Sequence, residues 1–405
     1  ALLDLDPAEF QRPEFLQYFS GQHLHPGFEP LAMVYSGHQF GVYNPQLGDG
    51  RGILLGEILN EKGERWDIHL KGAGKTPYSR FGDGRAVLRS CIREYLGSEA
   101  LHHLGIPTSR ALCIFGSREP VRRETIEQGA ALIRLSPSHI RFGSFEFFYY
   151  NKREDRLREL ADFVIDRHFP EFRHADNPYA ELFRHAVTAT AHMVAKWQAF
   201  GFAHGVMNTD NMSILGITFD YGPFGFMEDF VPGYICNHSD HQGRYAFHQQ
   251  PGIAMWNLNA LAQTFTPLVP QQTLIATLRE YETALLDHYH SLMYAKLGII
   301  NPQPDDQKLI TDLIGLLSAN HPDYSIFFRR LSHDDPDQSM APVADLFIDR
   351  ESARGWLERY RARIQQPVVH RCPHVGLASD GHVERAVREG RKGFRAYDAA
   401  SIGNK

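Results

Sequence analysis

The sequence predicts an α+β protein with two lobes, and three observations lead to this expectation. Short alternating strands and many glycines fill residues 31–150, and helical periodicity takes over after residue 150. The chain has 405 residues, more than a single hydrophobic core of roughly 250–300 residues accommodates. We therefore expect a strand-rich N-terminal lobe over 1–150 and a helical C-terminal lobe over 151–366. The remaining tail, 367–405, has no pattern that assigns it a role.

The clearest strand covers residues 66–71, where apolar and polar side chains alternate. One face holds Trp66, Ile68 and Leu70, and the other holds Asp67, His69 and Lys71. This is the period of a half-buried strand, with Lys71 on its polar face. A second, apolar strand is expected over 130–135. It contains Arg134, whose guanidinium needs an anionic partner in such surroundings.

A helix is expected between these strands, over 85–104. Its apolar stripe should comprise Leu88, Ile92, Tyr95 and Leu96, and a separate face should carry Arg85, Arg89 and Arg93. Glu94 has small residues one turn away, namely Ser90, Cys91, Gly97 and Ser98. These small residues should let the helix approach its neighbour closely.

Helices are expected in the C-terminal lobe at roughly 158–168, 179–200, 305–318 and 343–365, with several more between 252 and 297. One irregular, polar and Gly-rich segment, 204–230, interrupts them. Functional residues concentrate in segments of this kind.

Composition excludes some classes of partner. The formal net charge of -6 argues against broad binding to nucleic acid or anionic membrane. The longest stretch without Asp, Glu, Lys or Arg, 245–278, is too often interrupted by Pro, Gln and Asn to span a bilayer. The opening ALLDLD shows no signal-peptide pattern, although a start at Ala1 leaves a trimmed transit peptide open. We expect a monomer.

Cysteine usage indicates a reducing compartment. The four cysteines show no CxxC spacing, so neither a zinc ribbon nor a disulfide scaffold is expected. A bacterial cytoplasm is favoured, or a mitochondrial location if the source is eukaryotic. The 22 histidines contain no HExxH motif, and we expect scattered histidines rather than a histidine metal site.

Positive charge is concentrated in one stretch. Residues 71–93 contain six Lys or Arg and one Asp, a net +5 inside an acidic protein, which points to a polyanionic ligand. Upstream, Gly48-Asp49-Gly50-Arg51-Gly52 combines close backbone approach with a guanidinium suited to phosphate oxygens. A simple turn is the alternative for this glycine-rich segment.

The segment 204–230 carries the second candidate group. Asn211 and Asp220 flank an apolar run, 213–219, which we expect to form a tight hairpin. That hairpin would bring two hard oxygen ligands together, as Mg²⁺ or Mn²⁺ requires at a nucleotide. The alternative is that Asp210 and Asn211 only cap a turn.

The order of these features matches that of protein kinases: strand Lys71, helix Glu94, loop Asn211, then Asp220-Tyr221-Gly222. One feature departs from that pattern. When His204 and Asn211 are aligned on H-x-D-x-x-x-x-N, Val206 occupies the place of the proton-accepting Asp. The residues therefore leave three hypotheses: a nucleotide-binding pseudoenzyme, a true phosphotransferase, and an enzyme with another base and another phosphate.

Four strings resemble the selenoprotein O family: YSGHQFGVYNPQLGDGRG (35–52), HLKGAGKTPYSRFGDGRAVLRSCIREYL (69–96), HGVMNTDNMSILGITFDYGPFGF (204–226) and ICNHSDHQGRYAF (235–247). The resemblance implies a bilobal protein-kinase-like fold and transfer of AMP from ATP to Ser, Thr or Tyr hydroxyls of proteins. ATP would be bound in the reverse sense to that in kinases.

The resemblance also implies site residues. The positions expected to contact ATP are Gly48, Gly50, Arg51, Lys71, Asp83, Gly84, Arg134 and Arg141. Asn211 and Asp220 would hold Mg²⁺ or Mn²⁺, Asp210 would accept the hydroxyl proton, and Glu94 would pair with Lys71. Family members carry an activation-loop cysteine, here Cys236, that pairs near the C-terminus. The tail of this chain departs from the family, so we expect a free thiol at Cys236, with Cys372 as the candidate partner.

Overall fold

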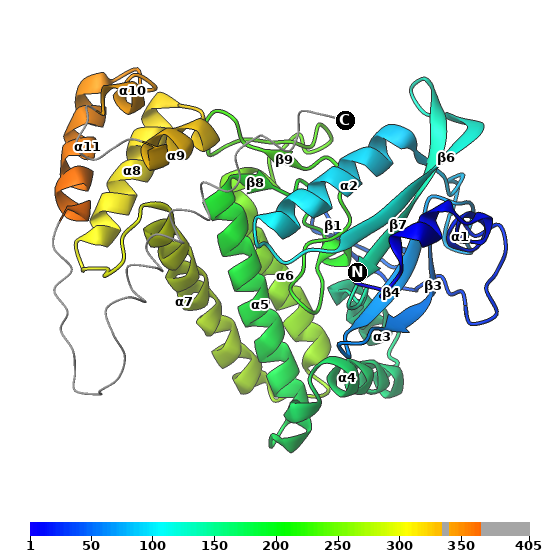
Figure 1. Ribbon diagram of the computed structural model, residues 1–405. Helices are drawn as coiled ribbons and strands as arrows, with labels where there is room; N and C mark the ends of the chain where they lie inside the picture. The colour runs from blue at the N-terminus through cyan, green and yellow to red at the C-terminus, as the bar shows by residue number, and fades with distance from the viewer. Residues whose placement is uncertain (334–339, 366–405) are drawn as a thin grey trace. The chain divides into compact units, whose positions relative to one another are not determined.

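A computed structural model describes residues 1–333 and 340–365, and it confirms the α+β class (Figure 1). The strands are β1 (Gly37–Gln39), β2 (Val42–Asn44), β3 (Gly52–Leu59), β4 (Arg65–Lys71), β5 (Ala86–Val87), β6 (Arg110–Arg122), β7 (Ile126–Ser136), β8 (Phe202–Ala203) and β9 (Gly225–Phe226). The helices are α1 (Pro13–Phe19), α2 (Leu88–His103), α3 (Phe142–Tyr150), α4 (Glu154–His168), α5 (Pro178–Phe200), α6 (Gln250–Phe265), α7 (Gln271–Lys296), α8 (Asp306–Asn320), α9 (Tyr324–His333), α10 (Ala341–Ala344) and α11 (Arg350–Ile364).

The chain forms two compact units. One comprises Ala1–Gln198, Phe202–Gly225 and Gly233–His288, and the other comprises Ala199–Gly201, Phe226–Pro232 and the described residues after His288. The first unit contains the largest sheet and every segment of the candidate site described below. The expected lobes, 1–150 and 151–366, remain a prediction.

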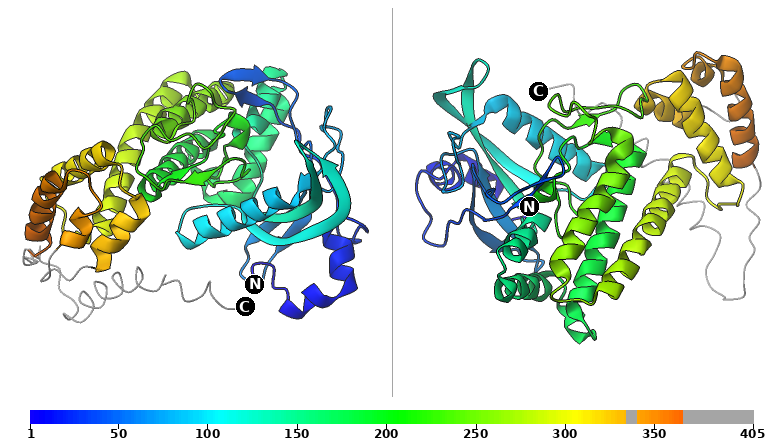
Figure 2. Two further views of the ribbon diagram at one scale, coloured as in Figure 1. Left: turned by 90° about the horizontal axis from the view of Figure 1, so that it is seen from above. Right: turned by 180° about the vertical axis from the view of Figure 1, so that it is seen from behind.

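The largest sheet has five antiparallel strands in the order β3-β4-β7-β5, with β6 also paired to β7. One face packs a hydrophobic cluster that includes Leu55, Ile68 and Ile133. Helix α2 lies along β6 and β7, and α3 packs against α4 and α6 (Figures 1 and 2). The opposite face carries a second hydrophobic cluster, which includes Ala130 and Leu132 and packs against α2, beside the polar residues of β4.

The strand predicted over 66–71 is confirmed as β4, but it is not half-buried. Ile68 and Leu70 are in the core as expected, yet His69 and Lys71 on the opposite face are only 1% and 8% exposed. The polar face is covered because acidic side chains from other segments pair with it. In the register with β7, His69 lies opposite Arg134. The polar face is therefore a buried ionic layer.

The helix predicted over 85–104 begins later, at Leu88, because Ala86 and Val87 pair with β7 as β5. Its predicted apolar stripe is confirmed in part: Leu88 and Tyr95 pack against a hydrophobic cluster, but Ile92 and Leu96 are 41% and 63% exposed. The buried face comprises Cys91, Glu94, Gly97, Ser98 and Leu101. The small residues around Glu94 do allow close approach, since a Cβ on Gly97 would lie 2.6 Å from the Phe224 ring. The need to bury Glu94 with its partners decided which face turned inward.

The helices predicted after residue 150 are present, but 343–365 is broken into α10 and α11. Sequence patterns missed α3, α9 and β6. The hairpin expected over 213–219 does not form. Its ends bridge instead to distant segments, Ser213 to Arg141 and Thr218 to Thr108. In the described ranges, we see no helix with the length and apolar character needed to cross a membrane.

One buried histidine should make the unfolding free energy depend on pH. His139 is fully buried, its Nδ1 lies 3.1 Å from Asp67 Oδ2, and its ring stacks on His69. Burial lowers the pKa of His139 to about 4, and the proximity of His69 adds to this, against the opposing effect of Asp67. The unfolded chain therefore takes up this proton first as the pH falls. The stability that neutral His139 contributes is complete above about pH 6.5 and is lost toward about pH 4.

We expect His139→Gln to make the loss of unfolding free energy between pH 6.5 and pH 4 shallower, by up to about 1.4 kcal/mol per pH unit. Urea unfolding at several pH values measures this slope. The exposed His23, replaced in the same way, is the control and should not change it. An unchanged slope in His139→Gln would show that this imidazole is not protonated on unfolding.

Candidate active site

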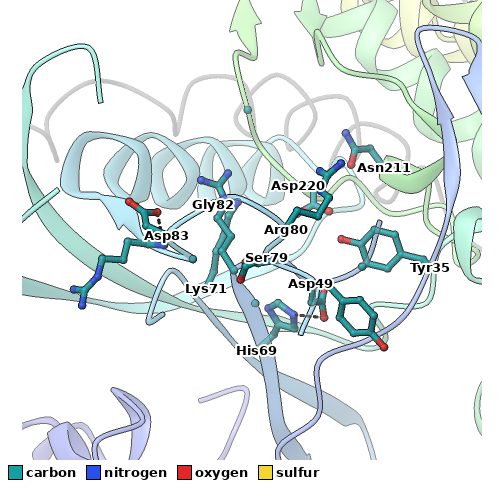
Figure 3. Close-up of a pocket in the computed structure, with 18 of the residues that line it drawn as sticks. Tyr35, Asp49, His69, Lys71, Ser79, Arg80, Gly82, Asp83, Asn211 and Asp220 are labelled. Atoms are coloured by element: carbon teal, nitrogen blue, oxygen red, sulfur yellow. Dashed lines mark hydrogen bonds and ion pairs between the residues drawn. The ribbon is translucent and has the colours of Figure 1, made fainter. Parts of the chain in front are cut away.

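A cavity of about 740 Å³ lies in the first unit, lined by segments that are far apart in the sequence. Its walls come from residues 48–52, 78–85 and 220–222, together with single residues from the sheet and from the loop after β8. Figure 3 shows Lys71, Asn211 and Asp220 directed toward this cavity from three separate segments. A cavity of this size suits a small ligand such as a nucleotide.

A buried network of charges forms the polar wall of the cavity. Lys71 Nζ donates to Glu94 Oε2 at 2.6 Å, and Arg134 Nε donates to the other oxygen of Glu94. Arg134 Nη2 also pairs with Asp220 Oδ1 at 2.6 Å. Burial raises the pKa of Glu94, but the two cations outweigh it and hold the pKa below its usual value. Glu94 is therefore the anion that Arg134 requires.

Arg141 extends this network beyond the cavity wall. It is 1% exposed, its Nη1 lies 2.5 Å from Asp220 Oδ2, and the same atom donates to the Asp210 carbonyl at 2.8 Å. Its guanidinium stacks on Tyr35 and Phe219. Lys71, Arg134 and Arg141 thus share two carboxylates, Glu94 and Asp220. Arg141 also lies 4.0 Å from Asp49, so this network is balanced in charge. The surplus of positive charge lies in the rest of the cavity lining, where arginines such as Arg51 outnumber acidic residues, and this suits an anion.

Two glycine-containing loops close one side of the cavity. Ser79 Oγ donates to the Gly50 carbonyl and Thr76 Oγ1 to the Asp49 carbonyl, each at 2.6 Å. A Cβ at Gly48, where φ is +117°, would lie 2.6 Å from the Tyr78 ring. The two loops can pack this tightly only because glycine occupies such positions.

Gly84 gives the sharpest test of this packing. Its φ is +70°, and a Cβ there would lie 2.0 Å from the Gly74 carbonyl oxygen. We expect Gly84→Ala to strain the loop by at least about 1–3 kcal/mol and to weaken ATP binding, measured by calorimetric titration. Gly233→Ala is the control, because nothing lies within 4 Å of a Cβ at that position. Equal ATP affinity in both variants would contradict the role given to this loop.

The loop from His204 to Asn211 is held rigidly. His204 Nε2 pairs with the Phe219 carbonyl at 3.0 Å, and His204 Nδ1 accepts from Val206 N at 3.3 Å, which fits a neutral imidazole. Burial lowers the pKa of His204 accordingly. Val206 lines the cavity. The position that holds a proton-accepting Asp in kinases therefore faces the site with an apolar side chain.

Asp210 lies beside the cavity, not on its lining. Its side chain is 6% exposed, and Oδ2 accepts from Gln39 Nε2 at 3.2 Å. Oδ1 is buried and has no hydrogen-bond partner within 1–333 and 340–365. Burial raises the pKa of Asp210 to about 6, against the opposing effects of Arg141 and Gln39. The loop thus offers a carboxylate with one uncommitted oxygen.

Comparison with known proteins assigns the sequence to a family. The family model described as protein adenylyltransferase SelO matches residues 1–377. The chain belongs to the SelO family. It is 56% identical over 369 residues to the protein nucleotidyltransferase YdiU of Pseudomonas fluorescens. This match covers 91% of this chain and 76% of the relative. The chain is 58% identical over 358 residues to that of Vibrio vulnificus, covering 88% and 73%.

The SelO resemblance implied eleven site residues, and the structure brings most of them together. Nine line the cavity: Gly48, Gly50, Arg51, Lys71, Asp83, Gly84, Arg134, Asn211 and Asp220. The other two, Asp210 and Arg141, do not line it but contact each other, and Arg141 pairs with Asp220. Asp83 is committed elsewhere in part, since Arg123 donates to its carboxylate at 2.8 Å. Its role toward ATP remains a prediction.

Asn211 and Asp220 fit a hard divalent cation by residue type. The amide nitrogen of Asn211 donates to the Val206 carbonyl at 2.9 Å, which orients the amide and leaves its oxygen as a candidate metal ligand. Asp220 holds a left-handed φ of 60° and shares its carboxylate with two arginines. Among the described residues, no three His, Cys, Asp or Glu form a metal site by themselves. Phosphate oxygens and water would complete the coordination.

Several residues of the site were missed from the sequence. Asp49 pairs with His69 at 3.2 Å, and Tyr35, Tyr78 and Arg123 also line the cavity. The position of Asp49 within the glycine-rich segment could have indicated a site residue. Its partner His69 lies on a strand 20 residues away and could not be found from local sequence. Cys236 forms no disulfide with any cysteine of the described residues, and burial raises its pKa to about 11. Cys372, its candidate partner, lies outside the described residues.

Proposed function

We propose that this chain transfers AMP from ATP to Ser, Thr or Tyr hydroxyls of protein substrates. The observation that carries the proposal is the convergence of Lys71 and Arg134 on the cavity wall, with Arg141 paired to Asp220 behind it. Val206 lines the same cavity at the position of the kinase base. A kinase-like bilobal fold is part of the proposal. The name of the family and the names of the bacterial relatives support it.

In this proposal, Lys71, Arg134 and Arg141 hold the β- and γ-phosphates of an ATP bound in the reverse sense to that in kinases. The acceptor hydroxyl oxygen forms a bond to the α-phosphorus, the bond from that phosphorus to the bridging oxygen breaks, and pyrophosphate leaves. Asp210 takes the hydroxyl proton. Stabilising the charge that develops on the leaving group is commonly the largest contribution to such a reaction. Mg²⁺ or Mn²⁺ held by Asn211 and Asp220 would neutralise phosphate charge.

ATP labelled at either the α- or the γ-phosphate tests the proposal. The protein is incubated with each label, a divalent metal and a bacterial protein extract, and label on protein is counted. Transfer of α-label alone is the expected result. Transfer of γ-label alone would indicate a phosphotransferase, and no transfer with Mg²⁺ or Mn²⁺ would indicate a nucleotide-binding pseudoenzyme.

A cytoplasmic location also remains a prediction.

A further inference from the structure

The hairpin formed by β1 and β2 lies directly against the loop that carries Asp210. His38 N donates to Thr209 Oγ1 at 2.7 Å, and Phe40 N donates to Asn208 Oδ1 at 3.3 Å. Between them, Gln39 reaches Asp210. Three consecutive residues of the hairpin thus contact three consecutive residues of the loop, although about 170 positions separate them in the sequence.

Gln39 binds the Asp210 carboxylate itself. Its Nε2 donates to Oδ2 at 3.2 Å, while Oδ1 has no hydrogen-bond partner in the part of the chain that the structure describes. A Cβ at residue 37 would lie 2.9 Å from Oδ1, so the close packing beside that oxygen requires glycine. One oxygen is held by Gln39, and the other is buried without a hydrogen-bond partner among the described residues. This is the arrangement expected of a carboxylate that must meet an incoming hydroxyl in a fixed orientation.

The hairpin that carries Gln39 is itself held in place by buried hydrogen bonds. Glu146 on α3 is fully buried, accepts from Thr209 Oγ1 at 3.0 Å and pairs with His38 Nδ1 at 3.1 Å. On the other side, Tyr245 Oη contacts both Phe40 N, at 2.9 Å, and Asn208 Oδ1, at 2.5 Å. The backbone on each side of Gln39 is therefore tied to the same loop that its side chain contacts.

We propose that Gln39 is a positioning residue for AMP transfer, holding the Asp210 carboxylate in the orientation that accepts the hydroxyl proton. The proposal rests on the proposed function, because it assigns Gln39 to the base of that reaction. Gln39 does not line the nucleotide cavity. Loss of its amide should consequently slow turnover without weakening ATP binding.

Gln39→Met tests this, since methionine is of similar length but donates no hydrogen bond. We expect kcat for α-label transfer to fall about tenfold to a hundredfold, with KM for ATP, calorimetric ATP affinity and the unfolding midpoint unchanged. Val42→Met is the matched control. Val42 lies opposite Gln39 in the hairpin and is 72% exposed, so that variant should retain the unmodified kcat.

The outcomes separate the two claims. An unmodified protein that transfers no α-label refutes the proposed function itself. An active unmodified protein with equal kcat in Gln39→Met refutes the positioning role alone. A fall in kcat accompanied by equal losses in ATP affinity and unfolding midpoint also refutes it, because Gln39 would then only support the fold.

Discussion

Asp210→Asn is expected to lower AMP transfer by about a hundredfold to ten-thousandfold, the contribution of a positioned general base. Asparagine has nearly the same shape as aspartate but accepts no proton. The Asp210 side chain does not line the cavity, so ATP affinity should remain close to that of the unmodified protein. Single-turnover transfer of α-label and calorimetric titration with ATP measure the two quantities separately.

Asp287→Asn is the control for this variant, because Asp287 is an exposed residue of α7. It should transfer label at the unmodified rate. Full activity in Asp210→Asn would remove Asp210 from the reaction and would leave the chain without an assigned base, since Val206 cannot take that role.

Arg134→Met is expected to have the second large effect, on both stability and activity. Arg134 is 2% exposed and pairs with Glu94 and Asp220. Its loss leaves two acidic groups short of a cation, which typically costs about 3–5 kcal/mol of unfolding free energy. Transfer should fall by about a hundredfold to a thousandfold, since charge stabilisation at the leaving phosphates is lost.

Arg134→Lys should lose less stability and less activity than Arg134→Met, but should fall below the unmodified protein in both. Lysine keeps the charge but cannot contact both carboxylates with a planar group. Urea unfolding and kcat/KM for ATP measure the two effects. Arg118→Met, at an exposed position on β6, is the control and should leave both unchanged. Unmodified stability in Arg134→Met would mean that the buried charges are not coupled as described.

Local patterns predicted the parts of the site that depend on neighbouring residues. Alternation along 66–71 placed Lys71 and Ile68 on the correct faces of β4. The small residues near Glu94 correctly indicated a close approach of α2. Arg134 in an apolar strand correctly implied an anionic partner, which is Glu94 together with Asp220.

Local patterns did not predict the features that depend on partners far away in the sequence. Ile92 and Leu96 are apolar, yet they are exposed because the buried ion pairs of Glu94 fix the orientation of α2. The run 213–219 does not form a hairpin because its ends pair with Arg141 and Thr108. No local pattern reveals such partners, and the contact of Gln39 with Asp210 was invisible for the same reason.

The product that ATP releases during protein labelling tests the central claim most directly. We expect one pyrophosphate to be released for each AMP attached to a protein hydroxyl, and both products to be strongly reduced in Asp210→Asn. Release of ADP together with phosphate attached to protein would contradict it, because the bond broken would then be at the γ-phosphate.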